Sequence, residues 1–444
     1  MKIAVIGTGI SGLSAAWLMR QSHDVTVFEQ SARLGGHTNT RMVTDPLGEL
    51  AIDTGFIVHN DRNYPRLLAL FDLLGIETQP SDMSFGASLD DGSLEYAGDA
   101  LFAQRRNLLS PSHWRMLIDI VRFNRLGKQA LTHRRLDGLS LGQWLDEHHF
   151  GEAFASRYLL PMAASIWSSP SQSIRSFSAA ALLEFFQNHG LLDLRHRPAW
   201  RTVVGGSIRY LERLSRDLEG RIHLSSGIAS IERHDSGVVL TDQAGQSRSF
   251  DGVVLGSHAD QSLAMLKDPD EVERSLLGSF KYRPNRAVLH SDERLMPKRR
   301  SAWSSWNYLA QSDQTMPSVS LTYWMNRLQQ LKAKNQYFVT LNPVVEPDAA
   351  LVHYETQYTH PVFDQGTRQA QASLGRLQGH RNCWYCGAWM GYGFHEDGLG
   401  SAIEAVARLG VVLPEAIQRA RVPGAPYMKN DLPWSGPGAE LINT

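Results

Sequence analysis

The stretch that decides the fold is residues 1–12, MKIAVIGTGISG, together with the pattern that continues from it to residue 36. Residues 3–6 are a short apolar run, which is typical of a buried parallel strand, and a helical pattern begins at Leu13. Residues 24–29 (DVTVFE) predict a second strand that ends in an acid, Glu29. Strand, glycines, helix, strand and acid therefore follow one another in the order of a dinucleotide-binding unit.

Three glycines, Gly7, Gly9 and Gly12, have the G-x-G-x-x-G spacing of such a unit. The first permits a tight turn, the second lets the backbone approach a pyrophosphate, and the third lets the helix pack close to the strand. The free N–H groups at the start of the helix would bind the phosphates. Glu29 follows Gly9 by 20 residues, the position from which an acid accepts hydrogen bonds from ribose hydroxyls.

A second motif, Arg33-Leu34-Gly35-Gly36, follows the acid after a short gap. A glycine pair at this point lets another loop approach the phosphates, and Arg33 can offset their charge. This R-x-G-G pattern resembles the FAD-binding signature of the flavin amine oxidase and phytoene desaturase superfamily. The resemblance implies an α/β fold: a Rossmann-like FAD-binding domain with a parallel sheet, interleaved with an α+β substrate domain.

The bulk properties limit the functions that this chain can have. The 444 residues exceed one typical core, and the formal net charge of −1 gives no reason to invoke nucleic acid. There is no run of about 18 apolar residues that would span a membrane, and no basic and apolar leader precedes the first strand. We therefore expect a cytoplasmic location.

The domain arrangement follows from where nucleotide-binding strands recur. Buried strands are predicted again at 252–256 (GVVLG) and 381–387 (RNCWYCG). The FAD-binding domain is therefore expected to be discontinuous, and the substrate domain to fill the intervals. The predicted FAD-binding segments are 1–78, 200–275 and 381–415, the substrate-binding segments are 79–199 and 276–380, and the C-terminal tail is 416–444.

Further elements follow from local patterns. Strands are predicted at 41–43, 49–52, 84–87, 93–96, 287–289, 318–325 and 337–341, and an antiparallel meander at 221–224, 228–232, 237–241 and 249–251. Helices are predicted at 64–74, 141–149, 207–218 and 401–409, and a long helical stretch at 154–186, broken at Pro161 and Pro170. Segments SIWSSPS and SFSAAALLEFF of that long stretch could wall an apolar pocket.

Residues 101–135 are predicted to be helical and hold eight Lys and Arg residues against one acid, Asp119. Trp114, Leu117, Ile118 and Val121 fall at helical spacing. One interpretation is an interfacial helix that docks on anionic lipid headgroups at the inner face of the membrane. The other, which we favour, is a solvated basic face on a helix of the substrate domain.

The only two cysteines, Cys383 and Cys386, are spaced C-x-x-C within an apolar strand that runs into a glycine loop. Residues three apart on a strand point to opposite faces, so we predict two buried structural thiols rather than a redox pair. Two cysteines cannot make a four-ligand zinc site, and no metal is expected.

More closely, the chain resembles the flavin-dependent oxidase-like domain found ahead of plant cyclopropane fatty acid synthases, and its stand-alone bacterial relatives. The resembling stretches are DTGFIVHN (53–60), SDMSFGASLD (81–90), SIWSSPS (165–171), NHGLL (188–192), RPAWRTVVGGS (197–207), SAWSSWN (301–307), LTYWMNRLQ (321–329), VTLNP (339–343) and GAWMGYGFHEDG (387–398). Well-understood superfamily members carry an acid directly after the glycine equivalent to Gly387, whereas this chain has Ala388.

This resemblance implies bound FAD, with the C-terminal segment returning to complete the site. The expected cofactor-binding residues are Gly7, Gly9, Ile10, Ser11, Gly12, Glu29, Gln30, Arg33, Gly35, Gly36, His37, Thr38, Gly55, Phe56, Ile228, Gly387, Ala388, Asp397, Gly398 and Leu399. A helix starting near Gly398 would aim its N-terminal amides at the flavin. Candidate catalytic groups are His395, Glu396, Tyr392 and His59, of which His395 is either a general base or a structural hydrogen-bonding group. Lys281 is the candidate for the lysine that amine oxidases often place near the flavin.

The leading hypothesis is an FAD-dependent oxidoreductase that takes a hydride from an apolar substrate. The resemblance implies a desaturase, oxidase or isomerase acting on an unsaturated or methylated fatty acyl chain, with a lipid methyltransferase as a candidate partner. The second hypothesis is an amine or polyamine oxidase that releases hydrogen peroxide, with Trp324, Tyr385, Trp389 and Tyr392 available for an aromatic cage. The third is a non-catalytic flavin-binding partner of a lipid methyltransferase.

Overall fold

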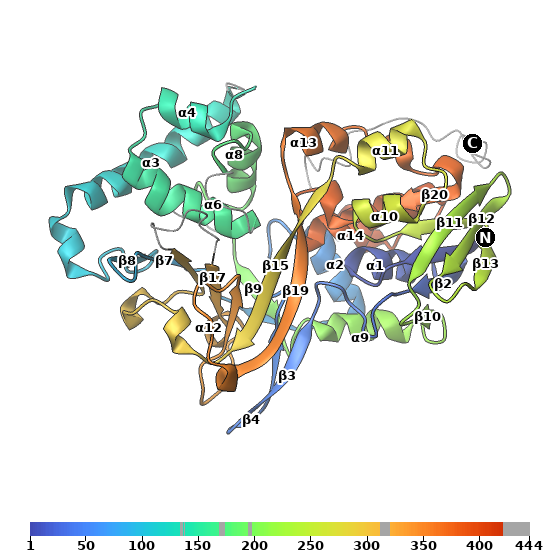
Figure 1. Ribbon diagram of the computed structural model, residues 1–444, viewed down its shortest axis with the longest axis horizontal. Helices are drawn as coiled ribbons and strands as arrows, with labels where there is room; N and C mark the ends of the chain where they lie inside the picture. The colour runs from blue at the N-terminus through green and yellow to red at the C-terminus, as the bar shows by residue number, and fades with distance from the viewer. Residues whose placement is uncertain (134–135, 137, 168–173, 194–197, 311–319, 421–444) are drawn as a thin grey trace.

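The protein is described here from a computed structural model, which describes residues 1–133, 136, 138–167, 174–193, 198–310 and 320–420. Two bodies lie side by side (Figure 1), one built on a parallel sheet and the other on a mixed sheet. The long strands β15 and β19 run between the helices of the two. None of the described helices is both long enough and apolar enough to cross a membrane.

A five-stranded parallel sheet forms the first body, in the order β10-β2-β1-β14-β20. Its strands are β1 (Lys2–Ile6), β2 (Asp24–Phe28), β10 (Ile222–His223), β14 (Gly252–Leu255) and β20 (Cys383–Tyr385). Segments from the beginning, middle and end of the chain therefore meet in one sheet, as the buried apolar runs predicted. The prediction for residues 221–224 was wrong in its partner, because β10 pairs in parallel with β2 at the sheet edge rather than joining the meander.

Side chains of β1 alternate between two hydrophobic cores, as a strand buried on both faces requires. Ile3 and Val5 pack in the core formed with four helices, and Ala4 and Ile6 pack in the core under the meander. The four helices are α1 (Ile10–Met19), α2 (Pro65–Leu74), α9 (Ile208–Arg216) and α14 (His395–Arg408). The meander strands are β11 (Ile228–His234), β12 (Gly237–Asp242) and β13 (Ser247–Phe250), and α10 (Ala259–Met265) and α11 (Glu271–Leu277) lie on the same side.

The two cysteines are buried on opposite faces of this sheet, as predicted. Cys383 packs in the core under the meander and Cys386 in the core with the four helices. Neither forms a disulfide, and burial raises the pKa of each thiol to about 12. They are therefore inert packing groups near neutral pH.

A seven-stranded mixed sheet forms the second body, in the order β19-β15-β18-β17-β16-β7-β8. Its strands are β7 (Phe85–Leu89), β8 (Leu94–Ala97), β15 (Lys281–His290), β16 (Trp306–Ala310), β17 (Ser320–Trp324), β18 (Phe338–Leu341) and β19 (Val352–Val362). Its helices include α3 (Pro111–Thr132), α4 (Leu141–Glu147), α5 (Glu152–Phe154), α6 (Leu160–Trp167) and α8 (Ala179–Asn188). Two separate stretches of chain thus build one sheet, which is the interleaving that the sequence predicted.

Three predicted helices have other limits than expected. The stretch 101–135 divides because Ser110 caps the N-terminus of α3 and Pro111 begins it, leaving a 3-10 turn, η1 (Arg105–Leu109), ahead of it. The stretch 154–186 also divides, but Pro161 lies in the first turn of α6, where a proline is tolerated, and Pro170 lies outside the described residues. Helix α14 begins at His395 rather than near 401, because the Asp397 carboxylate accepts the N–H of Phe394 and caps it.

Smaller elements complete the fold. These are β3 (Thr40–Asp45), β4 (Gly48–Asp53), β5 (Val58–Asn60), β6 (Thr78–Pro80), β9 (Trp200–Val203), α12 (Met325–Leu328), α13 (Gln365–Gln371) and α15 (Glu415–Arg419). Strands β3 and β4, predicted at 41–43 and 49–52, pair as an antiparallel hairpin, and β5, β9 and β6 form a three-stranded sheet.

Asp53, at the end of β4, joins the bodies through a buried carboxylate. It accepts hydrogen bonds from the Thr40 hydroxyl, from the N–H and hydroxyl of Ser207, and from the Gln329 amide at the end of α12. Gln329 in turn accepts the backbone N–H of Asp53. Burial raises the pKa of Asp53 to about 6, against the effect of the hydrogen bonds from Thr40 and Ser207.

We predict that Asp53→Ala lowers the free energy of unfolding by about 3 kcal/mol or more, because several buried donors lose their acceptor together. Asp53→Asn, which keeps the shape and part of the network, should cost less. Asp24→Ala, at an exposed position, is the matched control and should change stability by less than about 0.5 kcal/mol. Chemical denaturation measures all three, and equal effects at positions 53 and 24 would contradict the role of this node.

Candidate functional site

One cavity of about 1180 Å³ extends from the parallel sheet into the second body. Gly9, at the start of α1, and Gly387, after β20, both line it. The expectation that the two ends of the chain close over a single cavity is therefore confirmed. Pockets for small ligands usually measure about 300–1,000 Å³, so this cavity has room for a dinucleotide and a substrate together.

Most of the expected cofactor-binding residues lie on the wall of this cavity. They are Gly7, Gly9, Ile10, Ser11, Glu29, Gln30, Arg33, Gly35, Gly36, His37, Gly55, Phe56, Ile228, Gly387 and Ala388. The expected residues that do not line it are Gly12, Thr38, Asp397, Gly398 and Leu399. These five lie behind the wall: Leu399, for example, is fully buried in the core with the four helices.

The glycine loop shows why two of its glycines have different tasks. A Cβ built on Gly12 would lie 2.0 Å from the carbonyl oxygen of Gly7, so this position only permits α1 to pack against β1. A Cβ built on Gly9 would meet no atom within 4 Å, because Gly9 borders open space. No side chain caps the N-terminus of α1, so its first N–H groups are available to an anion in the cavity.

Glu29 follows β2 and fits a ribose contact. Its Oε2 accepts the N–H and hydroxyl of Thr8, at 2.9 and 2.6 Å, and its Oε1 accepts the N–H of Ser31 at 2.9 Å. These bonds fix the carboxylate on the cavity wall. A carboxylate has about four acceptor sites, so at least one remains for a ligand hydroxyl.

Arg33 lines the cavity, as expected, and also makes hydrogen bonds that were not predicted. Its guanidinium donates to the backbone carbonyls of Leu34, Gly36 and Thr38, at 3.1, 2.7 and 3.3 Å. The N–H groups of Arg33 thus stabilise the second glycine loop through its backbone carbonyls. The positive charge of Arg33 lies beside the cavity.

Three histidines, His37, His258 and His360, lie together on the cavity wall, and of these only His37 was predicted from the sequence. His37 lies 5.3 Å from His360 and 6.3 Å from His258, measured between ring centroids, and stacks on Tyr358 at 4.9 Å. The Nε2 atom of His37 is buried and has no hydrogen-bond partner among the described residues. Burial and the neighbouring histidines lower the pKa of His37 well below its usual value, so the ring is neutral.

A positional signal could have identified one of these histidines. His258 follows the end of the buried parallel strand β14, at the edge of the sheet at which ligands bind in α/β folds. His360 lies on β19, whose partners in the mixed sheet cannot be read from local pattern.

His395 lies on the cavity wall at the N-terminus of α14. Its ring stacks on Phe56 with centroids 3.8 Å apart, and its Nε2 lies 3.0 Å from the Thr38 hydroxyl and 3.1 Å from the Tyr210 hydroxyl. Burial, followed by the nearby His59, lowers the pKa of His395 to about 3. A base this weak, with one nitrogen already engaged by two hydroxyls, favours the structural alternative over the general base.

Two of the other proposed catalytic groups are not on the cavity wall. His59 is fully buried on β5, edge-on to Phe71 at 5.3 Å. Glu396 points away from the cavity and accepts the N–H groups of Arg66 and Leu67, both at 3.0 Å, so it caps α2 rather than its own helix. Tyr392 does line the cavity, and burial raises the pKa of its hydroxyl.

The far part of the cavity is an apolar chamber between the mixed sheet and the helices of the second body. Its walls include Tyr96, Tyr158, Met162, Ile166, Phe185, Trp306 and Tyr323. Ile166 and Phe185 belong to the two segments predicted to wall an apolar pocket, of which residues 168–173 lie outside the described part. Apart from Glu29, the described acids on the wall are Asp82 and Asp99, and both pair with Arg327 at 3.0 Å.

Two other predictions concerned residues expected near the flavin, and some of these residues do not line the cavity. Lys281 is exposed on β15 and donates to the carbonyl of Gly278, so it is not a cavity lysine. Of the four proposed cage aromatics, Trp389 and Tyr392 line the cavity, whereas Trp324 and Tyr385 do not.

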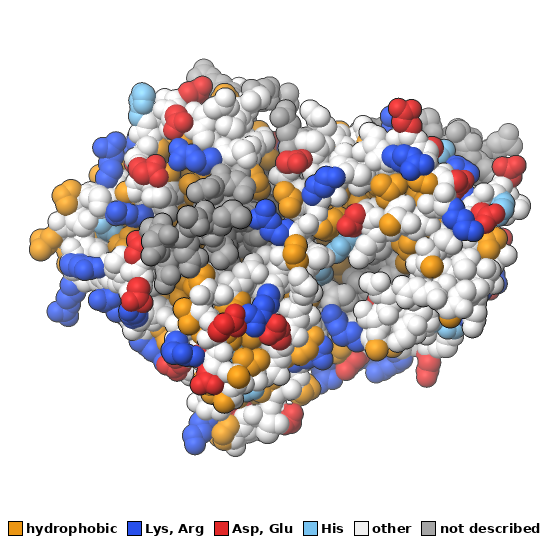
Figure 2. Space-filling view, in the orientation of Figure 1, with side chains coloured by type: hydrophobic (Ala, Val, Ile, Leu, Met, Phe, Trp, Pro, Cys, Tyr) orange, Lys and Arg blue, Asp and Glu red, His pale blue; other side chains and the backbone are white. Residues whose placement is uncertain are grey.

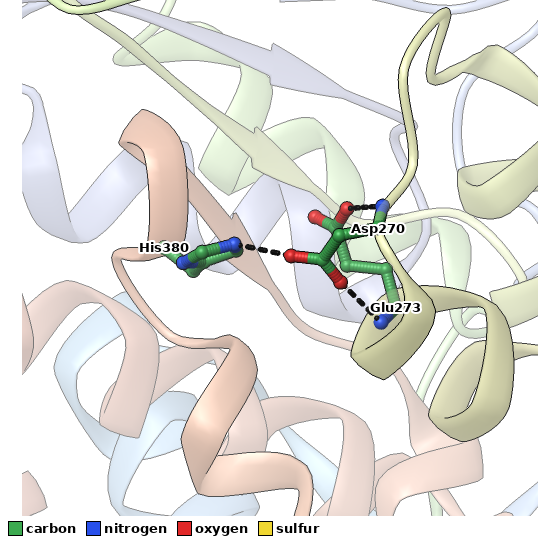
Figure 3. A group of neighbouring side chains, drawn as sticks. All are labelled: Asp270, Glu273 and His380. Atoms are coloured by element: carbon green, nitrogen blue, oxygen red, sulfur yellow. Dashed lines mark hydrogen bonds and ion pairs between the residues drawn. The ribbon is translucent and has the colours of Figure 1, made fainter.

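Asp270, Glu273 and His380 form a separate cluster of possible metal ligands (Figure 3). His380 Nε2 lies 2.6 Å from an Asp270 oxygen, and Asp270 and Glu273 exchange backbone-to-carboxylate hydrogen bonds as the cap of α11. Glu273 also pairs with the buried Arg233 and accepts the Tyr385 hydroxyl. Because each carboxylate already has a cation or donors, the cluster is explained as a helix cap and an ion pair.

Comparison with known proteins gives a consistent picture. A family model described as "Flavin containing amine oxidoreductase" matches residues 10–410. The chain is 28% identical over 262 residues to the Mycobacterium tuberculosis protein named "Putative flavin-containing monoamine oxidase AofH", a match covering 56% of this chain and 55% of that protein. The chain thus spans about half the length of the curated relatives it matches.

Solved structures share the fold at low sequence identity. Cyclohexylamine oxidase from Brevibacterium oxydans superposes with a TM-score of 0.65 at 15% identity, covering 91% of this chain and 98% of that one. A fatty acid isomerase from P. acnes that produces CLA superposes with a TM-score of 0.64 at 17% identity, covering 92% and 98%. These likenesses confirm the expected two-body α/β architecture.

We predict that the protein loses stability as the pH falls below about 6.5. Burial lowers the pKa of His59, His189, His290 and His360 to about 4 and that of His395 to about 3. The unfolded chain takes up protons at these histidines near pH 6.5 while the folded chain does not, so each contributes stability that is lost, by about 1.4 kcal/mol per pH unit, as the pH falls toward 4.

Fewer groups oppose this trend. Burial raises the pKa of Glu396 and Asp397 to about 7 and that of Asp53 to about 6, so these three favour the folded state at low pH and lose that contribution as the pH rises from about 4 to 7. Denaturation curves at pH 7 and pH 5 measure the balance. His290→Gln should reduce the pH dependence, and stability that rises toward pH 5 would contradict the prediction.

Proposed function

The chain belongs to the flavin containing amine oxidoreductase family, and from this premise we propose that it is an FAD-dependent oxidoreductase acting on an apolar substrate. The substrate class that we propose is an unsaturated or methylated fatty acyl chain. The observation that carries this proposal is the single cavity whose glycine-lined end and apolar chamber are continuous.

The residues at the glycine-lined end fit FAD. Gly9 borders open space beside the uncapped N-terminus of α1, which suits a pyrophosphate, and Glu29 keeps acceptor capacity for a ribose. The unpartnered Nε2 of His37 lies on the same wall and can bond to a further polar group of the cofactor. When bound, FAD supplies the chemistry of accepting a hydride from a substrate carbon.

The protein itself orients the cofactor and the substrate, excludes water from the site and sets the local electrostatic field. The N-terminus of α14 reaches the cavity at Phe394 and His395, and its dipole favours negative charge there. His395 is proposed as a positioning residue: its stack on Phe56 and its bonds to Thr38 and Tyr210 fix this wall.

The chamber favours a neutral and apolar substrate. Its described acids, Asp82 and Asp99, are neutralised by Arg327, and His189 on its wall is neutral because burial lowers its pKa to about 4. A cationic amine would therefore find no unpaired carboxylate among the described chamber residues. An acyl chain, by contrast, gains from contact with Met162, Ile166 and the surrounding aromatic side chains.

Each of the two candidate substrate classes has support from similarity to other proteins. The resemblance to the oxidase-like domain of plant cyclopropane fatty acid synthases, and the shared fold with a fatty acid isomerase, support an acyl chain. The sequence similarity to a protein named as a monoamine oxidase supports amine oxidation as the second candidate.

An anaerobic experiment separates the candidates. Purified holoprotein is mixed with phospholipid bearing unsaturated or methylated chains, or with a panel of amines, and flavin absorbance is followed while lipid products are analysed by mass. A desaturase bleaches the flavin and removes two hydrogens from the chain; an isomerase returns the hydride, so the mass is unchanged while a double bond moves. Bleaching by amines alone would overturn the acyl proposal, and no reaction with either class would favour a non-catalytic partner of a lipid methyltransferase.

Two glycine variants test the cofactor end. Gly9→Ala should fold normally but lower the affinity for FAD by tenfold or more, because its Cβ enters only the space assigned to the cofactor. Gly12→Ala should instead destabilise the whole protein, because its Cβ collides with Gly7. Gly366→Ala, where the nearest atom would lie at 3.4 Å, is the control.

The readouts are FAD retained after gel filtration and the thermal unfolding midpoint of the apoprotein. If the thermal unfolding midpoint of the Gly9→Ala apoprotein were as low as that of Gly12→Ala, the proposal that Gly9 serves the cofactor and Gly12 serves packing would be contradicted.

A further inference from the structure

We propose that the surface formed by η1 and the exposed side of α3 docks on an anionic lipid membrane. This surface is named here the α3 face, and it consists of Arg105, Arg106, Leu108, Leu109, Trp114, Arg115, Ile118, Val121 and Arg125. It was the less favoured interpretation of residues 101–135, and the side-chain exposures now favour it.

Large apolar side chains of the α3 face point into solvent. The exposed fractions are 88% for Leu109, 55% for Ile118 and 53% for Val121, and Leu108 and Trp114 are also about half exposed. Trp114, Ile118 and Val121 have i, i+4, i+7 spacing, so they form one stripe along α3. A shallow groove of about 380 Å³ runs among these side chains.

The stripe of Trp114, Ile118 and Val121 is not part of the hydrophobic core of the second body. The other side of α3 supplies Met116, Phe123 and Ala130, which are buried in the core with the neighbouring helices. Helix α3 is therefore apolar on two sides, and only one of them has a partner among the described residues. Exposed apolar stripes of this kind, rimmed by basic residues, are typical of helices that lie in a membrane interface.

The charge of the α3 face selects the partner. Arg105, Arg106, Arg115 and Arg125 are exposed, and Asp119 is the one acid of residues 101–133. Asp119 is buried and pairs with Arg115 and Arg122, so its one negative charge offsets part of the charge of that pair and leaves the other arginines of the face unopposed. Arg105 and Arg125 form no ion pair with the described residues, and Figure 2 shows blue and orange side chains gathered at the left edge, over the chain that leads into α3 in Figure 1.

An anionic bilayer fits this combination better than a second copy of the chain. A twofold contact would bring two copies of the same basic patch together, and the repulsion between them would oppose it. A bilayer offers lipid tails to Leu109, Ile118 and Trp114, and anionic headgroups to the arginines beside them.

The α3 face is also connected to the cavity. Leu101 lines the cavity, and its carbonyl lies 3.0 Å from Nε2 of His113 on α3. The next residue, Phe102, packs on Trp114 with ring centroids 5.2 Å apart. Docking would therefore hold the Leu101 wall of the chamber next to the bilayer, where an acyl chain enters, and this last step rests on the proposed function.

Vesicle flotation of the full-length holoprotein tests the docking itself. Vesicles of phosphatidylcholine with 30% phosphatidylglycerol (about one lipid in three) are compared with pure phosphatidylcholine, at low and high salt, and the floated protein is measured by flavin fluorescence. We expect binding to the anionic vesicles that weakens with salt, and at least tenfold weaker binding to neutral ones. Absence of salt-sensitive flotation would overturn the proposal.

Paired variants locate the contact. Leu109→Glu with Ile118→Glu should lower the binding constant by tenfold or more, and Arg105→Gln with Arg125→Gln by about fivefold for each arginine removed. The matched controls are Met42→Glu with Leu47→Glu, which are 62% and 69% exposed on the β3–β4 hairpin, and Arg213→Gln with Arg216→Gln, exposed on α9. Controls that lose as much binding as the α3-face variants would overturn the assignment.

Two further measurements keep the result interpretable. Thermal unfolding and the flavin spectrum show whether each variant is folded, independently of binding. Sedimentation shows whether the protein is a dimer that Leu109→Glu dissociates, an outcome that would assign the α3 face to a second copy and overturn the proposal. Flotation requires no turnover, so a failed acyl substrate test leaves this result unaffected, and the reverse also holds.

Discussion

The close contact of Gly12 with Gly7 and Gly256 is the constraint on which the rest of the structure depends. A Cβ built on Gly12 would lie 2.0 Å from the Gly7 carbonyl, and one built on Gly256 would lie 2.7 Å from the Gly12 Cα. Because neither side chain exists, α1 lies against β1 and β14 with its N-terminus at the cavity. On the other side of β14, β20 pairs in parallel with it, and Gly387 follows β20 to reach the same cavity from a distant part of the chain.

Around this contact the protein buries ionisable groups in their neutral forms. Histidines on the cavity wall have lowered pKa values, and Glu396 and Asp397 behind it have pKa values raised to about 7. The wall therefore carries little formal charge apart from Arg33, Glu29 and the paired acids at Arg327. A site of this kind suits a cofactor that brings its own charge and a substrate that brings none.

Features that depend on residues close together in the sequence could be predicted, and features that depend on distant residues could not. The glycine motif, Glu29 and the apolar run of β14 are local patterns. They predicted the parallel sheet correctly, and most of the residues they assigned to the cofactor line the cavity. His59 and Glu396 were named as candidate catalytic groups, but the position of a residue along the chain does not determine which way its side chain points. Glu396 turns to cap α2, a helix more than 300 residues away, through the N–H groups of Arg66 and Leu67.

Long-range pairing was the other limit. His360 and Tyr358 reach the cavity because β19 pairs with β15 in the mixed sheet, and no local signal specifies that register. Helix α3 was ambiguous for a similar reason: both of its sides are apolar, and only the packed structure shows which one the core uses.

The discontinuous parallel sheet has a consequence for biosynthesis. Its central strand β1 leaves the ribosome first, but β20 follows only after more than 370 further residues. At about 5–20 residues per second, the two walls of the cavity emerge roughly 20 to 75 s apart. Until β20 is made, β14 has an unpaired edge in the parallel sheet and the cavity lacks its wall at Gly387. We therefore expect the cofactor to be captured late in folding.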